Sequence, residues 1–441
     1  MKAKRIIILV FMALLIMPFC SRSQEDLIIM KRHRPHSKHL DMAFITNDGQ
    51  SDTTVILIFE ENAPERFNAP KTPSFALMSK QKKFIMGVGG YVKATASMDF
   101  DGAINNPAYF ITSAIPVPAV PGNSKLMQFN ANQTTLFYNL VSLSPKKNKF
   151  GAYININFSG QNFTPVLQDA YVTYGGFLIG RTTSLFTDAA AIPPTIDSQG
   201  PDGMIFLYNN VFNYRHSFGR HLSAGIGLEM PVADYTVNSD YQSVSNQYIP
   251  DIPAYIQFAW GNGNNSHVRL SGILRNTNYY NKVDDKENIV TTLGGQLSGL
   301  TTIANKVIFY YQCSYGKGLS TYIQDLNGLG LDFLPVTVHE DNTVKNEIKT
   351  ADAMSYYVGL QYNFNLRTFV SCTYSQVAVL LPDMYEDSNL YKEGYYLAAN
   401  FFWYAAPNVQ LGVEYIYGKR VNQDKQWGNA NRAQFMVQYN F

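Results

Sequence analysis

Basic residues recur at alternate positions of extended segments, as polar side chains do when they face a water-filled interior. Arg269 and Arg275 share one parity with Ser271, whereas Leu270 and Leu274 take the other. Counted in this way, the basic residues predicted to line the interior are Lys93, Arg181, Arg215, Arg269, Arg275, Arg367, Arg420 and Arg432. Cations in a low-dielectric wall would concentrate anions, and arginine can bind a carboxylate through two hydrogen bonds.

Fewer carboxylates share this parity; they are Asp99, Glu229 and Glu414. The segment from Thr187 to Gly203 supplies three more, which are Asp188, Asp197 and Asp202. Carboxylates opposite a row of arginines would form a constriction that orients dipolar solutes, and anion selectivity is the predicted result. The alternative is that these arginines only solvate a wet wall and pair with neighbouring carboxylates.

The composition of the 441 residues favours a wall with one face toward lipid and the other toward water. Charged residues make up 15% and aromatic residues 14%, against about 25% charged residues in ordinary soluble proteins. The mean hydropathy is nevertheless slightly negative, which excludes a helical membrane protein. A net charge of +2 argues against nucleic acid as a partner.

The one long apolar run lies at the N-terminus and reads as a signal peptide over residues 1–23. Cys20 offers a lipoprotein alternative, but the bulky Phe19 before it disfavours lipidation. Residues 24–83 are predicted to form a periplasmic extension, whose histidines at His33, His36 and His39 suit a solvated basic linker better than a metal site. Because no other run is long enough for a spanning helix, the membrane-spanning part must be a closed barrel.

From residue 84 to 441 the alternation predicts an all-β, up-and-down antiparallel barrel of sixteen strands. Seven short turns separate the longer connections; they lie at 144–147, 174–176, 217–220, 261–266, 302–305, 363–366 and 406–408. Seven turns on the side of the two termini require sixteen strands, an even number as in other bacterial barrels. A barrel of this size is wide enough for an aqueous channel. The isolated Cys313 and Cys372 read as wall residues.

One stretch resembles the DcaP-like family of outer-membrane porins. The resemblance rests on 168–188, Ile192-Pro-Pro-Thr-Ile-Asp197, Gly200-Pro-Asp-Gly203 and Gly89-Gly-Tyr-Val-Lys93. It implies a trimeric sixteen-stranded porin whose third extracellular loop folds into the pore, and which passes small, often anionic, solutes. Members of the family commonly carry a coiled coil before the barrel, and residues 24–83 show no such heptads.

The sequence therefore predicts an outer-membrane porin for small hydrophilic solutes, favouring anions such as carboxylates. Its expected partners are outer-membrane lipid, lipopolysaccharide, small anionic solutes and two further copies in a homotrimer. The alternative is a barrel used for adhesion or partner binding through the long 319–351 loop. No serine-nucleophile elbow or phosphate-binding glycine loop is present, and we expect no catalytic residue, cofactor or metal.

Overall fold

The computed structural model describes residues 75–79, 84–120, 122, 124–142, 150–261, 264–304, 306–340, 343–382, 385 and 389–441. It gives only the backbone of 29–32, 40–45, 54–59, 78, 337–340 and 343–345. The predicted signal peptide, residues 33–39 with their three histidines, and the predicted turn at 144–147 lie outside the described residues.

Most described residues belong to one antiparallel sheet that closes on itself, as the alternating pattern predicts. Its strands are β4 (Phe75–Met78), β5 (Phe84–Phe100), β6 (Leu126–Asn130), β7 (Thr135–Ser142), β8 (Phe150–Asn157), β9 (Val166–Tyr174), β10 (Phe177–Thr183), β11 (Tyr208–Phe218), β12 (Leu222–Glu229), β13 (Gln242–Val244), β14 (Ile252–Trp260), β15 (Ser266–Asn281), β16 (Lys286–Ile303), β17 (Val307–Lys317), β20 (Asp352–Asn363), β21 (Thr368–Leu380), β22 (Tyr391–Ala406), β23 (Val409–Asn422) and β24 (Trp427–Asn440).

These segments fill sixteen positions around the barrel, and the predicted strand number is confirmed. Strands β6 and β7 share one position, since both pair with β5, β13 and β14 share another beside β15, and β4 and β24 share a third on the other side of β5. Strand β5 pairs with β24 along Tyr91–Phe100 and with β4 along Ile85–Val88, so β4 extends the sheet before the predicted boundary at residue 84. Gly90 and Phe441 close the ring by exchanging backbone hydrogen bonds of 2.9 and 3.0 Å.

Burial alternates along the strands with the predicted parity. In β15, Arg269, Ser271 and Arg275 are buried, whereas Leu270 between them is exposed. In β24, Phe435 is exposed on the opposite face. We call the face of the buried, mostly polar side chains the inner face and the face of the exposed, mostly apolar ones the outer face. Polar atoms toward the interior and apolar atoms toward lipid is the arrangement a membrane-spanning barrel requires.

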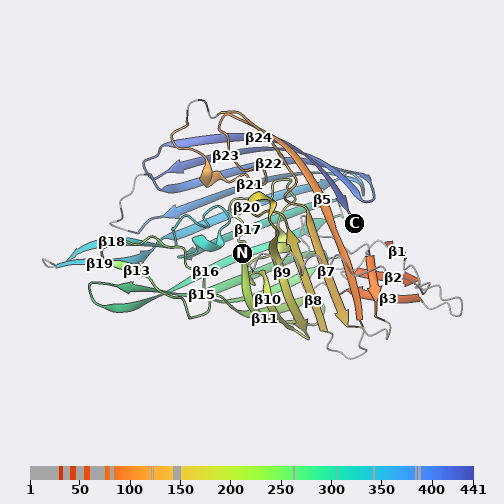
Figure 1. The fold of residues 1–441 in the computed structure, drawn as a ribbon, viewed down its shortest axis with the longest axis horizontal. Helices are drawn as coiled ribbons and strands as arrows, with labels where there is room; N and C mark the ends of the chain where they lie inside the picture. The colour runs from red at the N-terminus through yellow and green to blue at the C-terminus, as the bar shows by residue number, and fades with distance from the viewer. Residues whose placement is uncertain are drawn as a thin grey trace, which may run out of the picture.

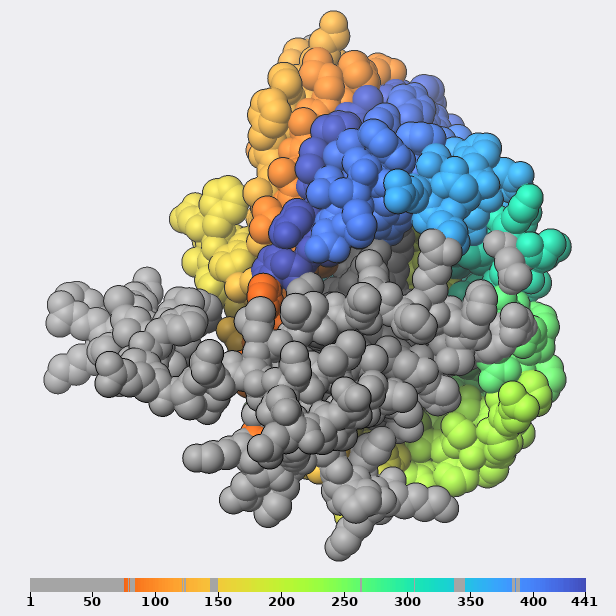
Figure 2. Space-filling view, turned by 90° about the vertical axis from the view of Figure 1, so that its right-hand side faces the viewer, coloured from red at the N-terminus to blue at the C-terminus, as the bar shows by residue number. Residues whose placement is uncertain are grey.

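The strands follow one another around the ring in chain order. Figure 1 shows the long strands running side by side, with the β18 (Phe333–Glu340) and β19 (Thr343–Thr350) hairpin at one end. In Figure 2 the last strands, in blue, meet the first, in orange. Of the predicted short turns, the six within the described residues connect adjacent strands; they are the turns from β9 to β10, β11 to β12, β14 to β15, β16 to β17, β20 to β21 and β22 to β23.

The remaining elements are small. A separate three-stranded sheet consists of β1 (Ile29–Arg32), β2 (Leu40–Ile45) and β3 (Thr54–Phe59). Single-turn 3₁₀ helices are η1 (Thr112–Ala114), η2 (Gln161–Phe163), η3 (Ala189–Ala191) and η5 (Ser320–Tyr322). Within the described residues, no helix has the length and apolar character needed to cross a membrane.

Candidate functional site in the barrel interior

The connection from β10 to β11, residues 184–207, makes hydrogen bonds to strands far around the ring. Lys93 Nζ on β5 donates to Ile196 O at 2.9 Å, and Tyr357 on β20 donates its hydroxyl to Ala191 O at 3.0 Å. The Glu414 carboxylate on β23 accepts from the backbone N–H groups of Ile196 and Asp197, both at 2.8 Å. These wall residues belong to the inner face. These contacts support the predicted folding of the connection into the barrel, which remains a prediction.

The end of this connection is held at Gly203. Its N–H donates to Ser375 Oγ at 2.8 Å, and its carbonyl accepts from Gln312 Nε2 at 2.8 Å and Ser355 Oγ at 2.7 Å. A Cβ atom at this position would lie 3.0 Å from the Gln376 carbonyl, so a larger residue would push the chain off β20 and β21. The glycine therefore permits close docking against the wall.

Asp188, predicted to face arginines, instead pairs with His267. The His267 Nε2 lies 2.9 Å from Asp188 Oδ2, and Ser298 Oγ donates to the same oxygen at 2.7 Å. Burial alone would raise the pKa of Asp188, but the charge and hydrogen bond of His267, with the charge of Arg269, lower it to about 2. The carboxylate is thus ionised, yet only 2% of its surface is exposed, so it contacts protein rather than solvent.

The other two predicted carboxylates are buried as well. Asp197 accepts from the N–H groups of Phe110 at 2.9 Å and Gln199 at 3.1 Å, and burial raises its pKa to about 6. Thr112 Oγ1 lies 2.6 Å from Asp202 Oδ2 and 2.7 Å from Asp325 Oδ2. Asp202 and Asp325 also interact directly, and burial together with this repulsion raises the pKa of Asp202 well above its usual value.

Four of the predicted pore-lining cations lie on the inner face but act as clamps. The Arg432 guanidinium binds Asp99 through Nε at 2.5 Å and Nη2 at 2.9 Å, and it also donates to the carbonyls of Ile104 and Asn106. Lys93 is buried beneath the 184–207 connection. Each cation has exchanged water for fixed acceptors, which is the usual condition for burying a charge.

Arg275 and Arg269 are clamps of the same kind. Arg275 binds the carboxylates of Asp251 at 3.2 Å and Asp332 at 3.0 Å and donates to two backbone carbonyls. Arg269 donates to Leu185 O and lies 3.8 Å from the ring centroid of Tyr255. The row of arginines predicted to line an open interior is therefore mostly covered by the connections that these arginines bind.

Two inner-face arginines keep partial exposure. Arg215 is half-buried on β11. Arg420 on β23 donates to Ser113 O at 2.5 Å and Asn422 Oδ1 at 2.9 Å, and its ring-face contact with Tyr391 is 6.0 Å. These two remain candidates for contact with a permeating solute.

The prediction is wrong for Arg181 and Arg367. Arg181 shares a face of β10 with the exposed Phe177 and Ile179, so it lies on the outer face, where its Nε donates to Leu167 O at 3.1 Å. It cannot face Asp188. Arg367 is exposed in the turn between β20 and β21, because the strand begins one residue later. Strand β10 pairs with β11 without a register shift, so the parity of Phe177 and Ile179 itself places Arg181 on the outer face. Parity gives no direction for Arg367, because that residue lies in a turn.

The sequence did not reveal two further connections that pack inside. The connection from β17 to β18 buries Leu319, Tyr322, Ile323 and Leu326 in one apolar cluster with Phe186. Their spacing of three, four and seven residues is typical of a buried amphipathic turn and could have identified it. Phe333, Leu334, Val336 and Ile348 of the same loop are buried too, so much of the 319–351 loop packs against the wall and its own side chains, which weakens the adhesion alternative.

The connection from β5 to β6 is the second. Ile104, Phe110 and Ile115 pack against Tyr396 and Ile416 on the inner faces of β22 and β23.

In the described part of the chain, no group of three or more His, Cys, Asp or Glu side chains is arranged to hold a metal ion. Cys313 and Cys372 are exposed on the outer face, as expected for wall residues.

A sequence model of one family, described as DcaP outer membrane protein, matches residues 71–441. The chain belongs to this family. It is accordingly a protein of the outer membrane, and the resemblance seen around residues 168–203 is confirmed. A comparison with curated protein sequences gives no match.

Solved porin structures share the fold of this DcaP family member. The outer membrane channel DcaP of Acinetobacter baumannii superposes with a TM-score of 0.68 at 19% identity, covering 83% of this chain and 99% of the other. OmpT of Vibrio cholerae gives 0.52 at 10% identity, with 83% and 99% covered. An anion-selective porin from Comamonas acidovorans gives 0.50 at 12% identity, with 81% and 100% covered. At these identities the likeness concerns the fold.

Proposed function

We propose that this DcaP family member is a passive pore for small hydrophilic solutes. One observation carries the proposal: a closed sixteen-position barrel whose inner face is polar while its outer face is apolar. A barrel of that width cannot be filled by its own wall side chains alone. Family membership supports a channel over an enzyme.

The connections inside the barrel would set the size of the passage. Residues 184–207 and the buried part of 319–334 are fixed to the wall by Lys93, Glu414 and Arg275. Solutes would pass between these connections and the polar inner face. A passage narrowed in this way favours small solutes and makes the few exposed charges along it decisive.

The charges that keep partial exposure support a preference for anions. Arg215 and Arg420 are half-buried, whereas the inner-face carboxylates Asp99, Glu229 and Glu414 are fully buried. The accessible wall charge is therefore positive even though acidic residues are present. Anions such as carboxylates, which a guanidinium binds through two hydrogen bonds, are the proposed solutes.

Single-channel conductance and reversal potential in a salt gradient test both parts. The unmodified protein should conduct ions, and the sign of its reversal potential should show that anions permeate more readily than cations. Arg215→Gln with Arg420→Gln should reduce that selectivity several-fold without abolishing conductance, while Lys419→Gln, which changes a half-buried cation on the outer face, should leave it unchanged. Absence of conductance from folded protein would reject the pore, and cation selectivity would reject the anion preference.

We also propose a homotrimer, because one side of the barrel is too short to face lipid. Strands β7 to β10 have 8, 8, 9 and 7 residues, against 18 in β16. Eight tilted residues span about 20 Å, less than the apolar band of about 25 Å. Arg181 lies on this outer face, where exposure to lipid would cost about 2–4 kcal/mol at the midplane. Contact with further copies would remove both costs.

A further inference from the structure

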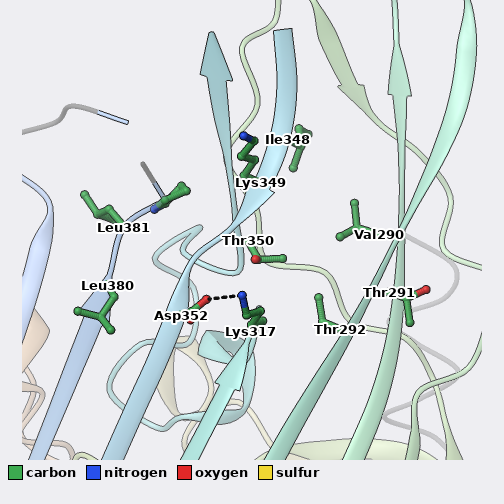
Figure 3. A pocket seen from close by; sticks show the side chains of 11 residues that line it. Val290, Thr291, Thr292, Lys317, Ile348, Lys349, Thr350, Asp352, Leu380 and Leu381 are labelled. Atoms are coloured by element: carbon green, nitrogen blue, oxygen red, sulfur yellow. Dashed lines mark ion pairs between the residues drawn. The ribbon is translucent and has the colours of Figure 1, made fainter. Parts of the chain in front are cut away.

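Strand β16 extends beyond the end of β17 at Lys317, and this leaves a notch in the wall at the end that carries the β18–β19 hairpin. Strand β16 pairs with β17 only along Gly294–Ile303, so its segment Lys286–Leu293 pairs with β15 alone. The cavity in the notch has a volume of about 540 Å³, far more than one water needs. Figure 3 shows its lining from β16, β17, β19, β20 and the end of β21.

The notch carries more hydrogen-bond donors than it uses. Lys317 lies 3.9 Å from Asp352 Oδ1, too far for a hydrogen bond, and the other Asp352 oxygen accepts from the Tyr315 hydroxyl at 2.5 Å. Among the described residues, no hydrogen bond from the ammonium group of Lys317 or Lys349 is found. Both side chains reach the notch, with the hydroxyl of Thr350 beside them. Such a set of donors fits an anionic group with several oxygens.

The notch opens at the rim of the lipid-facing surface. The side chain of Lys317 is 61% exposed and shares its strand face with the exposed Tyr315. Leu293 and Leu380, next to the notch on β16 and β21, are 67% and 53% exposed. Positive groups directly above an apolar band lie where lipid headgroups lie, and lysines there attract anionic lipid.

We propose that the notch binds a phosphate of an outer-leaflet glycolipid, the lipid part of lipopolysaccharide. The phosphate would lie between Lys317 and Lys349, with sugar hydroxyls against Thr350 and the unpaired edge of β16. The acyl chains would run along Leu293 and Leu380. The site is on the outer face, so it does not depend on the proposed pore, and failure of one leaves the other intact.

Native mass spectrometry of the full chain, folded in non-ionic detergent and titrated with bis-phosphorylated lipid A, tests the site. We expect one tightly held lipid A per barrel. Lys317→Gln with Lys349→Gln should weaken binding on the order of 30-fold, since each lysine near an anionic lipid surface contributes about a fivefold factor. Lys125→Gln with Lys425→Gln removes equal charge from exposed positions away from the notch and should change binding less than threefold.

The lipid source is tested with two more probes. Dephosphorylated lipid A should bind the unmodified protein as weakly as phosphorylated lipid A binds the double variant. Equal binding of both lipids, or equal loss in the control variant, would overturn the proposal. Displacement of lipid A by equimolar inorganic phosphate would assign the notch to a free anion instead. Both variants should keep wild-type conductance and heat-modifiable gel mobility, which excludes misfolding as the cause of a loss.

Discussion

The clamp formed by Arg432 and Asp99 distinguishes a structural arginine from a selectivity arginine. The guanidinium is fully buried and makes four hydrogen bonds, two to the carboxylate and two to backbone carbonyls of the β5–β6 connection. In an Arg432→Met variant, Asp99 would still accept a hydrogen bond of 2.9 Å from the Ile104 N–H of that connection. Removing one partner of a buried ion pair usually costs about 3–5 kcal/mol, because a buried charge stays uncompensated.

We therefore expect Arg432→Met to lower the free energy of unfolding by about 3–5 kcal/mol. Urea titration of detergent-solubilised protein, followed by tryptophan fluorescence and by mobility of unboiled samples, measures this. Arg432→Met combined with Asp99→Leu removes both charges and should recover more than half of the loss. A single variant within about 1 kcal/mol of wild type, the median for an exposed pair, would refute the clamp, above all if anion selectivity fell instead.

Three further predictions concern the 184–207 connection and the outer face of the barrel wall. Burial raises the pKa of Asp197 from its ordinary value of 3.8 to about 6 in the folded protein, so the free energy of unfolding should fall by about 3 kcal/mol as pH rises from about 4 to 6; Asp197→Asn should remove that part of the slope in urea titrations at several pH values. Gly180→Ala would place a Cβ 2.2 Å from the Ala170 carbonyl at a φ of 139°, so stability should fall by about 1–3 kcal/mol in the same assay. Arg181→Glu should shift native-gel mobility from trimer to monomer; a trimer that persists would count against the short-wall interface.

The sequence was sufficient to predict the barrel because its signal is local. Alternating parity in stretches such as 267–275 and turn residues such as Gly175-Gly176 fix strand number and face without any long-range information. The same parity placed Lys93, Arg269, Arg275 and Arg432 on the inner face. The prediction for Arg181 was wrong because it did not follow the parity of β10, and the prediction for Arg367 was wrong because that residue lies in a turn, where parity gives no direction.

The interior could not be predicted to the same degree, since it depends on contacts between distant residues. Nothing local in Arg275 indicates that Asp251, Asp332 and the Gly318 carbonyl will meet around it. A solvated arginine and a buried arginine occupy the same position in an alternating strand pattern, so the pattern cannot distinguish them. The alternative in which arginines pair with neighbouring carboxylates is accordingly the better description of Arg432 and Arg275.

The hydroxyl of Thr112 lies between two carboxyl groups, from Asp202 and Asp325, and it has a single hydrogen to give. Asp325 also accepts from the Ser113 N–H at 3.0 Å and the Tyr391 hydroxyl at 2.8 Å, so it is the better supported anion. The close approach of Thr112 to Asp202 then requires that Asp202 itself retain a hydrogen. Three connections are joined by a relay of two hydrogens rather than by two like charges. A count of acidic residues in the sequence therefore overstates by one the negative charge where Thr112, Asp202 and Asp325 meet. The electric potential near this point is correspondingly more positive.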